Sequence, residues 1–163
     1  MFIWFAAGSA AIVWAVFQSP AIDYRMVMVG SLLAVAEAPF GVGPLQTLAA
    51  SVVLLGIVMV STIGRRLVRR RWLGLPIGTF LHLVLDGSWS RTRVFWWPAA
   101  GFSFPRARSL IAARGIWSLV LELAGVLIAL SLWGRFGLSD AARRRQFLTT
   151  GQLDRGFVRS DGS

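Results

Sequence analysis

Long apolar runs separated by short polar breaks dominate the pattern along this chain. The runs cover residues 2–19, 26–38, 45–63, 72–86 and 116–133. Run 45–63 carries no charged residue and has about the length that a helix needs to cross the hydrocarbon core of a bilayer, roughly 20 residues. The pattern therefore predicts an all-α membrane protein, a small polytopic bundle of about five helices with four to five spans.

Charges at the ends of the runs predict an orientation. Run 45–63 is followed by Gly64 and by five arginines within residues 65–71, and such clusters stay on the cytoplasmic side. The chain turns back at Trp72, so run 72–86 leads outward and run 116–133 returns. If Met26–Ala38 also crosses, there are five spans, with twelve arginines inside and five outside. If this short run does not cross, there are four spans and the N-terminus is inside.

Composition changes near residue 134 and predicts two regions. Residues 1–134 form the expected transmembrane helical domain, whose first run is interpreted as a retained anchor because it lacks a positive leader region. Residues 135–163 are rich in Arg, Asp, Gly and Ser, which predicts a mostly disordered cytoplasmic tail with a short helix near residues 139–149.

The overall composition bears on whether the partner is nucleic acid or the lipid bilayer. Hydrophobic residues make up 56% of the 163 residues, and the net charge of +10 comes from 17 basic residues, all of them Arg; the mean hydropathy is +0.66. A basic chain can bind nucleic acid, but these arginines flank apolar runs. They favour the lipid bilayer and its anionic headgroups as partners and argue against nucleic acid. The absence of Cys excludes disulfides and thiolate metal sites.

His82, the only histidine, and Asp86 lie four residues apart in an apolar run. On a helix they share one face, and ionisable residues inside a membrane usually mark a site. A His–Asp hydrogen bond near the helix end is the alternative, and the sequence favours neither reading strongly.

Antiparallel connections place further polar residues at the same depth, in the outer half of the bundle. These are Glu37, Gln46, Thr47 and Glu122. A divalent metal needs several donors from different helices. We therefore consider a Zn, Mn or Mg ion held by His82, Asp86 and Glu37, with the remaining polar residues nearby. The alternative is that these residues pair with arginines such as Arg25 or Arg114 and hold the bundle together.

Two sequence blocks resemble a known family. PIGTFLHLVLDGSW…FWWP (76–98) is similar to the C-terminal motif of the membrane-bound metal-dependent hydrolases, small bacterial inner-membrane proteins that include the LexA-regulated type. DYRMVMVGSLL…APFG…LQTLAAS (23–51) is similar to their earlier block. The resemblance covers about residues 22–101 and implies a multi-pass protein of the bacterial cytoplasmic membrane. It further implies that metal-bound water cleaves a lipid-linked or membrane-proximal ester or phosphoester.

Departures from the family pattern affect the expected metal ligands. The family has His before the Thr or Ser that opens a helix, whereas Gln46 precedes Thr47 here, and Ala34–Val35 replaces a Pro-Asp pair. Glu37 stands where the element that begins with the Pro-Asp pair has a second Asp. The last motif of the family, His-x-x-x-Asp, is intact as His82 and Asp86. The sequence thus predicts a catalytically degenerate member. The rival prediction is a non-enzymatic structural or assembly subunit that packs against another membrane protein; a transporter is disfavoured because no inverted repeat is visible.

Overall fold

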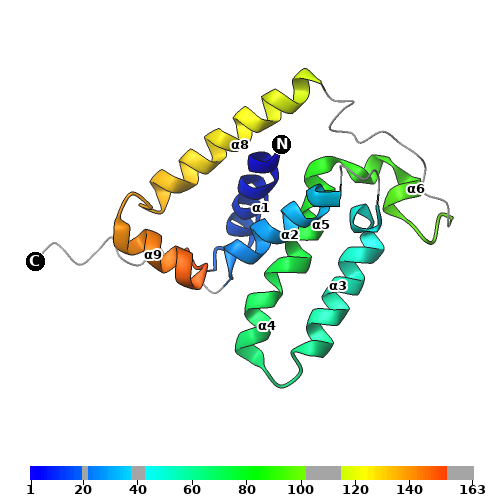
Figure 1. The fold of residues 1–163 in the computed structure, drawn as a ribbon, viewed down its shortest axis with the longest axis horizontal. Coiled ribbons are helices and arrows are strands. Elements are labelled where there is room, and N and C mark those ends of the chain that lie inside the picture. The colour runs from blue at the N-terminus through cyan, green and yellow to red at the C-terminus, as the bar shows by residue number, and fades with distance from the viewer. Residues whose placement is uncertain (20–21, 38–42, 102–114, 154–163) are drawn as a thin grey trace, which may run out of the picture.

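The computed structural model describes residues 1–19, 22–37, 43–101 and 115–153, which form helices and turns only (Figure 1). The predicted all-α class is confirmed for this part of the chain. Its α-helices are α1 (Phe2–Phe17), α2 (Tyr24–Glu37), α3 (Leu48–Ser61), α4 (Arg66–Trp72), α5 (Gly74–Asp86), α6 (Thr92–Phe95), α8 (Ile116–Arg135) and α9 (Ala141–Thr150), and its 3₁₀ helices are η2 (Pro44–Gln46) and η3 (Ser88–Ser90).

Helices α2 and α5 cross at a very short distance because a glycine of each helix lies against the backbone of the other. A Cβ added at Gly30 would lie 2.1 Å from the carbonyl oxygen of Leu75, and one added at Gly78 would lie 2.1 Å from that of Val27. Gly74, one turn before Gly78, would bring a Cβ to 2.9 Å from Asp23 O. Small residues four apart let helix backbones approach in this way, so this crossing fixes the centre of the bundle.

The arginine-rich segment is helical, whereas the sequence suggested a turn with the return starting at Trp72. The chain reverses earlier, at residues 62–65, where Gly64 has a left-handed backbone with φ of 77°. Helix α4 then runs into α5 as one rod, interrupted only at Leu73. Pro76 explains the interruption, since it has no N–H to donate to the carbonyl of Trp72.

Helix α1 lies between α2 and α8 (Figure 1). A Cβ added at Gly125 of α8 would lie 2.4 Å from the backbone nitrogen of Trp4, so this pair of helices also meets at a glycine. On the other side of α1, the buried Ser9 hydroxyl donates to the Ser31 hydroxyl of α2 at 3.2 Å. Each hydroxyl also bonds a carbonyl of its own helix, Ser9 that of Ala6 at 3.0 Å and Ser31 that of Met28 at 2.8 Å, so both buried hydroxyls are satisfied.

The described first part of the tail packs onto the bundle. Helix α9 corresponds to the short helix expected near residues 139–149. Phe136, Leu138 and Leu153 are buried in one core with Tyr24 and Val27 of α2. Although many polar residues separate these three apolar side chains along the chain, burying all of them in one cluster removes their apolar surface from water. Residues 154–163 lie outside the described part.

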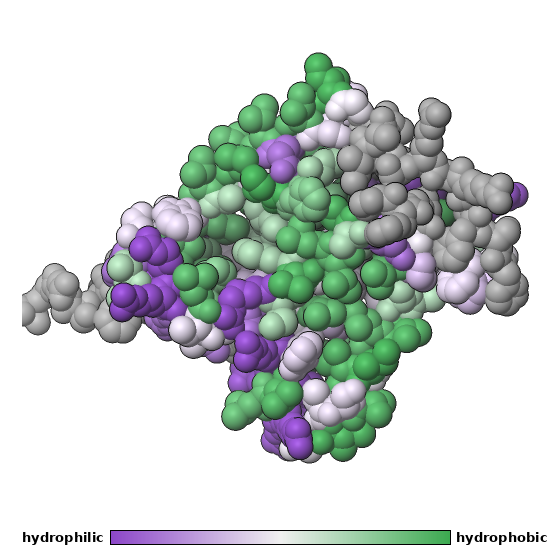
Figure 2. Space-filling view, in the orientation of Figure 1, coloured by the Kyte–Doolittle hydropathy of each residue, from purple (hydrophilic) through white to green (hydrophobic). Residues whose placement is uncertain are grey.

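Apolar side chains cover much of the surface, as Figure 2 shows in green for one face. In α8 only 6% of the most apolar 18-residue window is buried, and Leu123 and Leu127 are 66% and 68% exposed. Among the described helices, α8 is the one that is long and apolar enough to cross a membrane. Helix α3 covers 14 residues of the expected 19-residue span, because Leu45 and Gln46 belong to η2, Thr47 caps the helix and residues 62–63 belong to the turn that follows.

Replacing Gly30 by Ala should destabilise the protein by about 1–3 kcal/mol, because its methyl group has to push apart two helix backbones. Thermal unfolding in mild detergent, followed by circular dichroism, measures the effect. Gly56→Ala is the matched control, since nothing lies within 4 Å of a Cβ at Gly56 of α3. We expect the control to unfold at or slightly above the wild-type temperature. Equal behaviour of both variants would contradict the close crossing.

Candidate functional site

His82 lies inside the bundle, on the side of α5 that meets α1. Its side chain is almost inaccessible, with 4% relative exposure. The imidazole ring packs on Phe5 of α1, with ring centroids 4.2 Å apart and planes inclined by 39°. This histidine is therefore part of the packed contact between two helices.

Asp86 is the last residue of α5, four residues after His82 as the sequence indicated. Gly87 follows in the left-handed conformation, with φ of 69°, and ends the helix. The Ser88 hydroxyl donates a hydrogen bond to Asp86 Oδ2 at 2.8 Å. The half-buried carboxylate thus lies at the turn after α5, one helical turn beyond His82.

Glu37 and Thr47 both stabilise the connection between α2 and α3. Glu37 Oε2 accepts a hydrogen bond from the Leu45 N–H at 3.0 Å, which ties the end of α2 to η2, the element that contains Gln46. Thr47 is fully buried, donates to Pro44 O at 2.7 Å and accepts from the Ala50 N–H at 3.1 Å as the N-cap of α3. These are backbone-capping roles, typical of residues next to helix starts.

Glu122 of α8 holds the N-terminal turn of α1. Its carboxylate accepts hydrogen bonds from the Ile3 N–H at 3.2 Å and the Trp4 N–H at 3.5 Å, and it pairs with the Met1 ammonium group at 3.1 Å. The first N–H groups of a helix lack intrahelical partners and carry a partial positive charge. A carboxylate at this place both satisfies and neutralises them.

The expected metal set of His82, Asp86 and Glu37 is not assembled. In residues 1–19, 22–37, 43–101 and 115–153, no group of three or more His, Asp or Glu side chains is placed to hold a metal ion. Glu37 bonds the Leu45 N–H of η2, and His82 packs on Phe5 of α1.

Asp23 forms an ionic cluster that sequence reasoning did not identify. The residue is buried, with 3% exposure, and its Oδ2 lies 3.1 Å from Arg25 Nη2 and 3.3 Å from Arg71 Nε. Oδ1 accepts from the Arg25 and Met26 N–H groups at the start of α2. Its position directly before a helix is the signal that identifies an N-cap, whereas the partner Arg71 has no such signal in the sequence.

Arg25 extends this cluster to the tail. It donates to the carbonyl oxygens of Leu148 and, at 3.1 Å, Thr149 at the end of α9. A cation at the C-terminal end of a helix satisfies carbonyls that have no intrahelical partner. Gly151 completes the fit: its N–H and carbonyl bond Phe147 O and the Tyr24 N–H, and a Cβ there would lie 1.8 Å from Asp23 Oδ1. The cluster therefore binds the ends of α2, α4 and α9 together.

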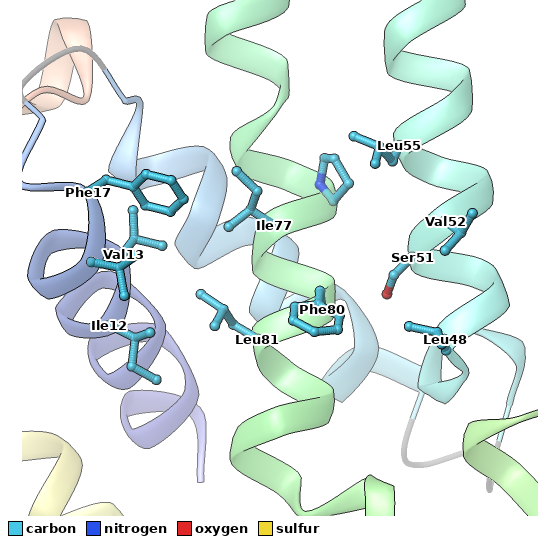
Figure 3. A pocket seen from close by; sticks show the side chains of 12 residues that line it. Ile12, Val13, Phe17, Leu48, Ser51, Val52, Leu55, Ile77, Phe80 and Leu81 are labelled. Carbon is cyan, nitrogen blue, oxygen red and sulfur yellow. The ribbon is translucent and has the colours of Figure 1, made fainter.

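A groove of about 440 Å³ opens between α1 and α3, with α5 as its floor (Figure 3). Its lining is apolar except for Ser51 of α3, whose side chain extends toward α5. Ser51 is 5% exposed, and its hydroxyl has no hydrogen-bond partner among the described residues. Two other hydroxyl residues at the end of the same helix, Ser61 and Thr62, bond the carbonyls four residues before them at 2.6 Å, which is the usual solution for such side chains.

No protein-family model, curated protein sequence or solved structure matches this chain. The resemblance to membrane-bound metal-dependent hydrolases thus remains a prediction from the sequence blocks.

Replacing Arg25 by Gln should loosen α9. Hydrogen bonds from a charged donor contribute about 1.5–3 kcal/mol each, so amide hydrogen exchange in residues 141–150 should become roughly tenfold faster or more. Arg70→Gln is the control, because Arg70 is exposed and makes no ion pair within the described residues. Unchanged exchange in Arg25→Gln would show that the tail is held by its apolar side chains alone.

Proposed function

We propose that this chain is a multi-pass membrane protein that serves as a non-catalytic subunit, packing against another membrane protein through the groove between α1, α3 and α5. The observation that carries the proposal is an apolar groove with one buried, unpartnered hydroxyl, that of Ser51. The location expected from the sequence blocks is the bacterial cytoplasmic membrane.

Exposed apolar helix faces support the membrane placement. Water would solvate the leucine-rich side of α8 and the valine-rich side of α3 poorly, and soluble monomers rarely expose apolar patches of this extent. The rod of α4 and α5 runs from Arg66 to Asp86, which at ~1.5 Å per residue is about 30 Å long. The charged α4 belongs to the headgroup region, so only α5, about 20 Å long at ~1.5 Å per residue, enters the hydrocarbon, which is roughly 30 Å thick.

Ser51 favours a protein over a lipid chain as the occupant of the groove. A lipid chain would fill the space but offers the hydroxyl no hydrogen bond, and a buried hydroxyl without one costs about 1–3 kcal/mol. A helix of another protein can supply both an apolar face and an acceptor or donor, as interhelical bonds of Ser and Thr do in membranes. The partner is therefore an apolar transmembrane helix with one polar group near mid-groove.

The hydrolase function predicted from the family resemblance receives less support. Glu37 and Glu122, two of the carboxylates considered as ligands, are bonded to backbone N–H groups of neighbouring elements. Gln46 and Val35 already stand where the family pattern has His and Asp. A degenerate member with a retained scaffold is consistent with both the sequence departures and this geometry.

The placement of the arginines predicts the topology. A cysteine introduced at Arg70 should react with a membrane-impermeant maleimide only after the cytoplasmic face is opened, and one at Ser90 should react in intact cells. Both side chains are exposed, so a cysteine that does not react is one that the reagent cannot reach across the membrane. Labelling of both positions from the same side would contradict the arrangement.

A photocrosslinking amino acid at Phe80, on the floor of the groove, should yield one defined protein adduct in native membranes. The same amino acid at Leu123 of α8, which faces outward, is the control and should yield lipid adducts or none. Adding Ser51→Leu should abolish the Phe80 adduct, because the larger side chain fills the groove and removes the hydroxyl.

Two results would overturn the proposal. One is a Phe80 adduct pattern that matches the Leu123 control and does not respond to Ser51→Leu. The other is purified protein that holds one divalent metal per chain and loses it in His82→Ala and Asp86→Ala, since a metal lost with either residue would make them ligands. Metal analysis of the wild-type protein together with both variants decides between a subunit and a hydrolase.

A further inference from the structure

A second apolar groove lies between α3 and the rod of α4 and α5. It has a volume of about 340 Å³, and its apolar lining comes from Leu54, Ile57, Val58, Val68, Trp72 and Leu75. We call it the hairpin groove, since it lies along the reversal of the chain between α3 and α4. Two hydroxyls in its wall, Ser61 and Thr62, already bond carbonyls of α3, so the groove offers its occupant no unsatisfied hydroxyl, unlike the groove at Ser51.

Uncompensated positive charge lies in the segment that forms one wall of this hairpin groove. Of the five arginines in residues 65–71, Arg71 pairs with Asp23. The others, Arg65, Arg66, Arg69 and Arg70, make no ion pair within the described residues. Like charges this dense repel one another, and an anion bound among them would relieve the repulsion.

Helical spacing connects the charge to the groove. Val68 and Trp72 are one turn apart and both line it. Arg65 is the N-cap residue of α4, three residues before Val68, and Arg69 follows Val68 directly, so both arginines lie close along the chain to a residue that lines the groove. Trp72 is 44% exposed and has the amphipathic ring that favours the boundary between headgroups and hydrocarbon.

From this juxtaposition we infer that the hairpin groove binds an anionic phospholipid, with an acyl chain in the groove and the phosphate on Arg65 and Arg69. Arginine forks bind phosphate oxygens in pairs, and basic clusters directly next to a membrane span recognise anionic lipid. A single molecule with an apolar chain and an anionic head matches both halves of the site. The inference rests on the proposed membrane placement but not on the partner at the Ser51 groove.

Native mass spectrometry of the detergent-solubilised protein with added phosphatidylglycerol or phosphatidylcholine tests the site. Wild-type protein should retain phosphatidylglycerol in preference to phosphatidylcholine. The double variant Arg65→Gln/Arg69→Gln should weaken phosphatidylglycerol binding about 25-fold, from roughly fivefold per arginine. Val68→Trp should weaken binding of the same lipid by occupying the groove while leaving every charge in place.

Arg144→Gln/Arg145→Gln on α9 is the matched control, because it removes two exposed charges away from the hairpin groove. It should bind phosphatidylglycerol as the wild type does. Equal weakening in this control, or full binding by Val68→Trp, would show attraction of lipid by net charge alone and would overturn the site. Alkaline extraction of membranes that contain each variant tests the membrane placement separately. If the protein does not span the membrane, this extraction releases even the wild type, whereas loss of the lipid site alone leaves every variant in the membrane.

Discussion

The crossing of α2 and α5 at glycines is the constraint from which the remaining contacts follow. With no side chain at Gly30, Gly74 and Gly78, the two backbones approach to distances that any Cβ would prevent. The close approach brings the start of α2 beside the end of α4, where Asp23 meets Arg71. Helices α1 and α3 pack on either side of α5, and the groove at Ser51 lies between them (Figure 3).

Carboxylates in this chain mainly join helix ends. Glu122 holds the first turn of α1, Glu37 holds the entry to η2 and Asp23 caps α2. In a low-dielectric surrounding, a carboxylate that accepts N–H groups costs far less than an unpaired one. Such pairing lowers the free-energy cost of burying or half-burying acids in a mostly apolar bundle.

The sequence predicts local features well and contacts between distant segments poorly. Apolar runs located α1, α2, α5 and α8 within a few residues, since a helix in an apolar surrounding needs little more than a continuous run. The i, i+4 spacing of His82 and Asp86 on one helix also holds. Glu37 and Glu122 were expected near His82 and Asp86 because they lie at the same depth, but they bond the backbone of η2 and of α1. Depth alone does not determine how each helix is rotated about its axis. The burial of Phe136 and Leu153 depends on a docking surface that no local pattern reveals.

The contact between Asp23 and the end of α9 has a consequence for the order of folding. A ribosome produces Asp23 early, Arg71 considerably later and the Leu148–Gly151 segment after all the long helices. The carbonyls that Arg25 binds come from α9, so this cluster cannot close until residues 148–151 have been made. Until then, this end of the bundle stays open.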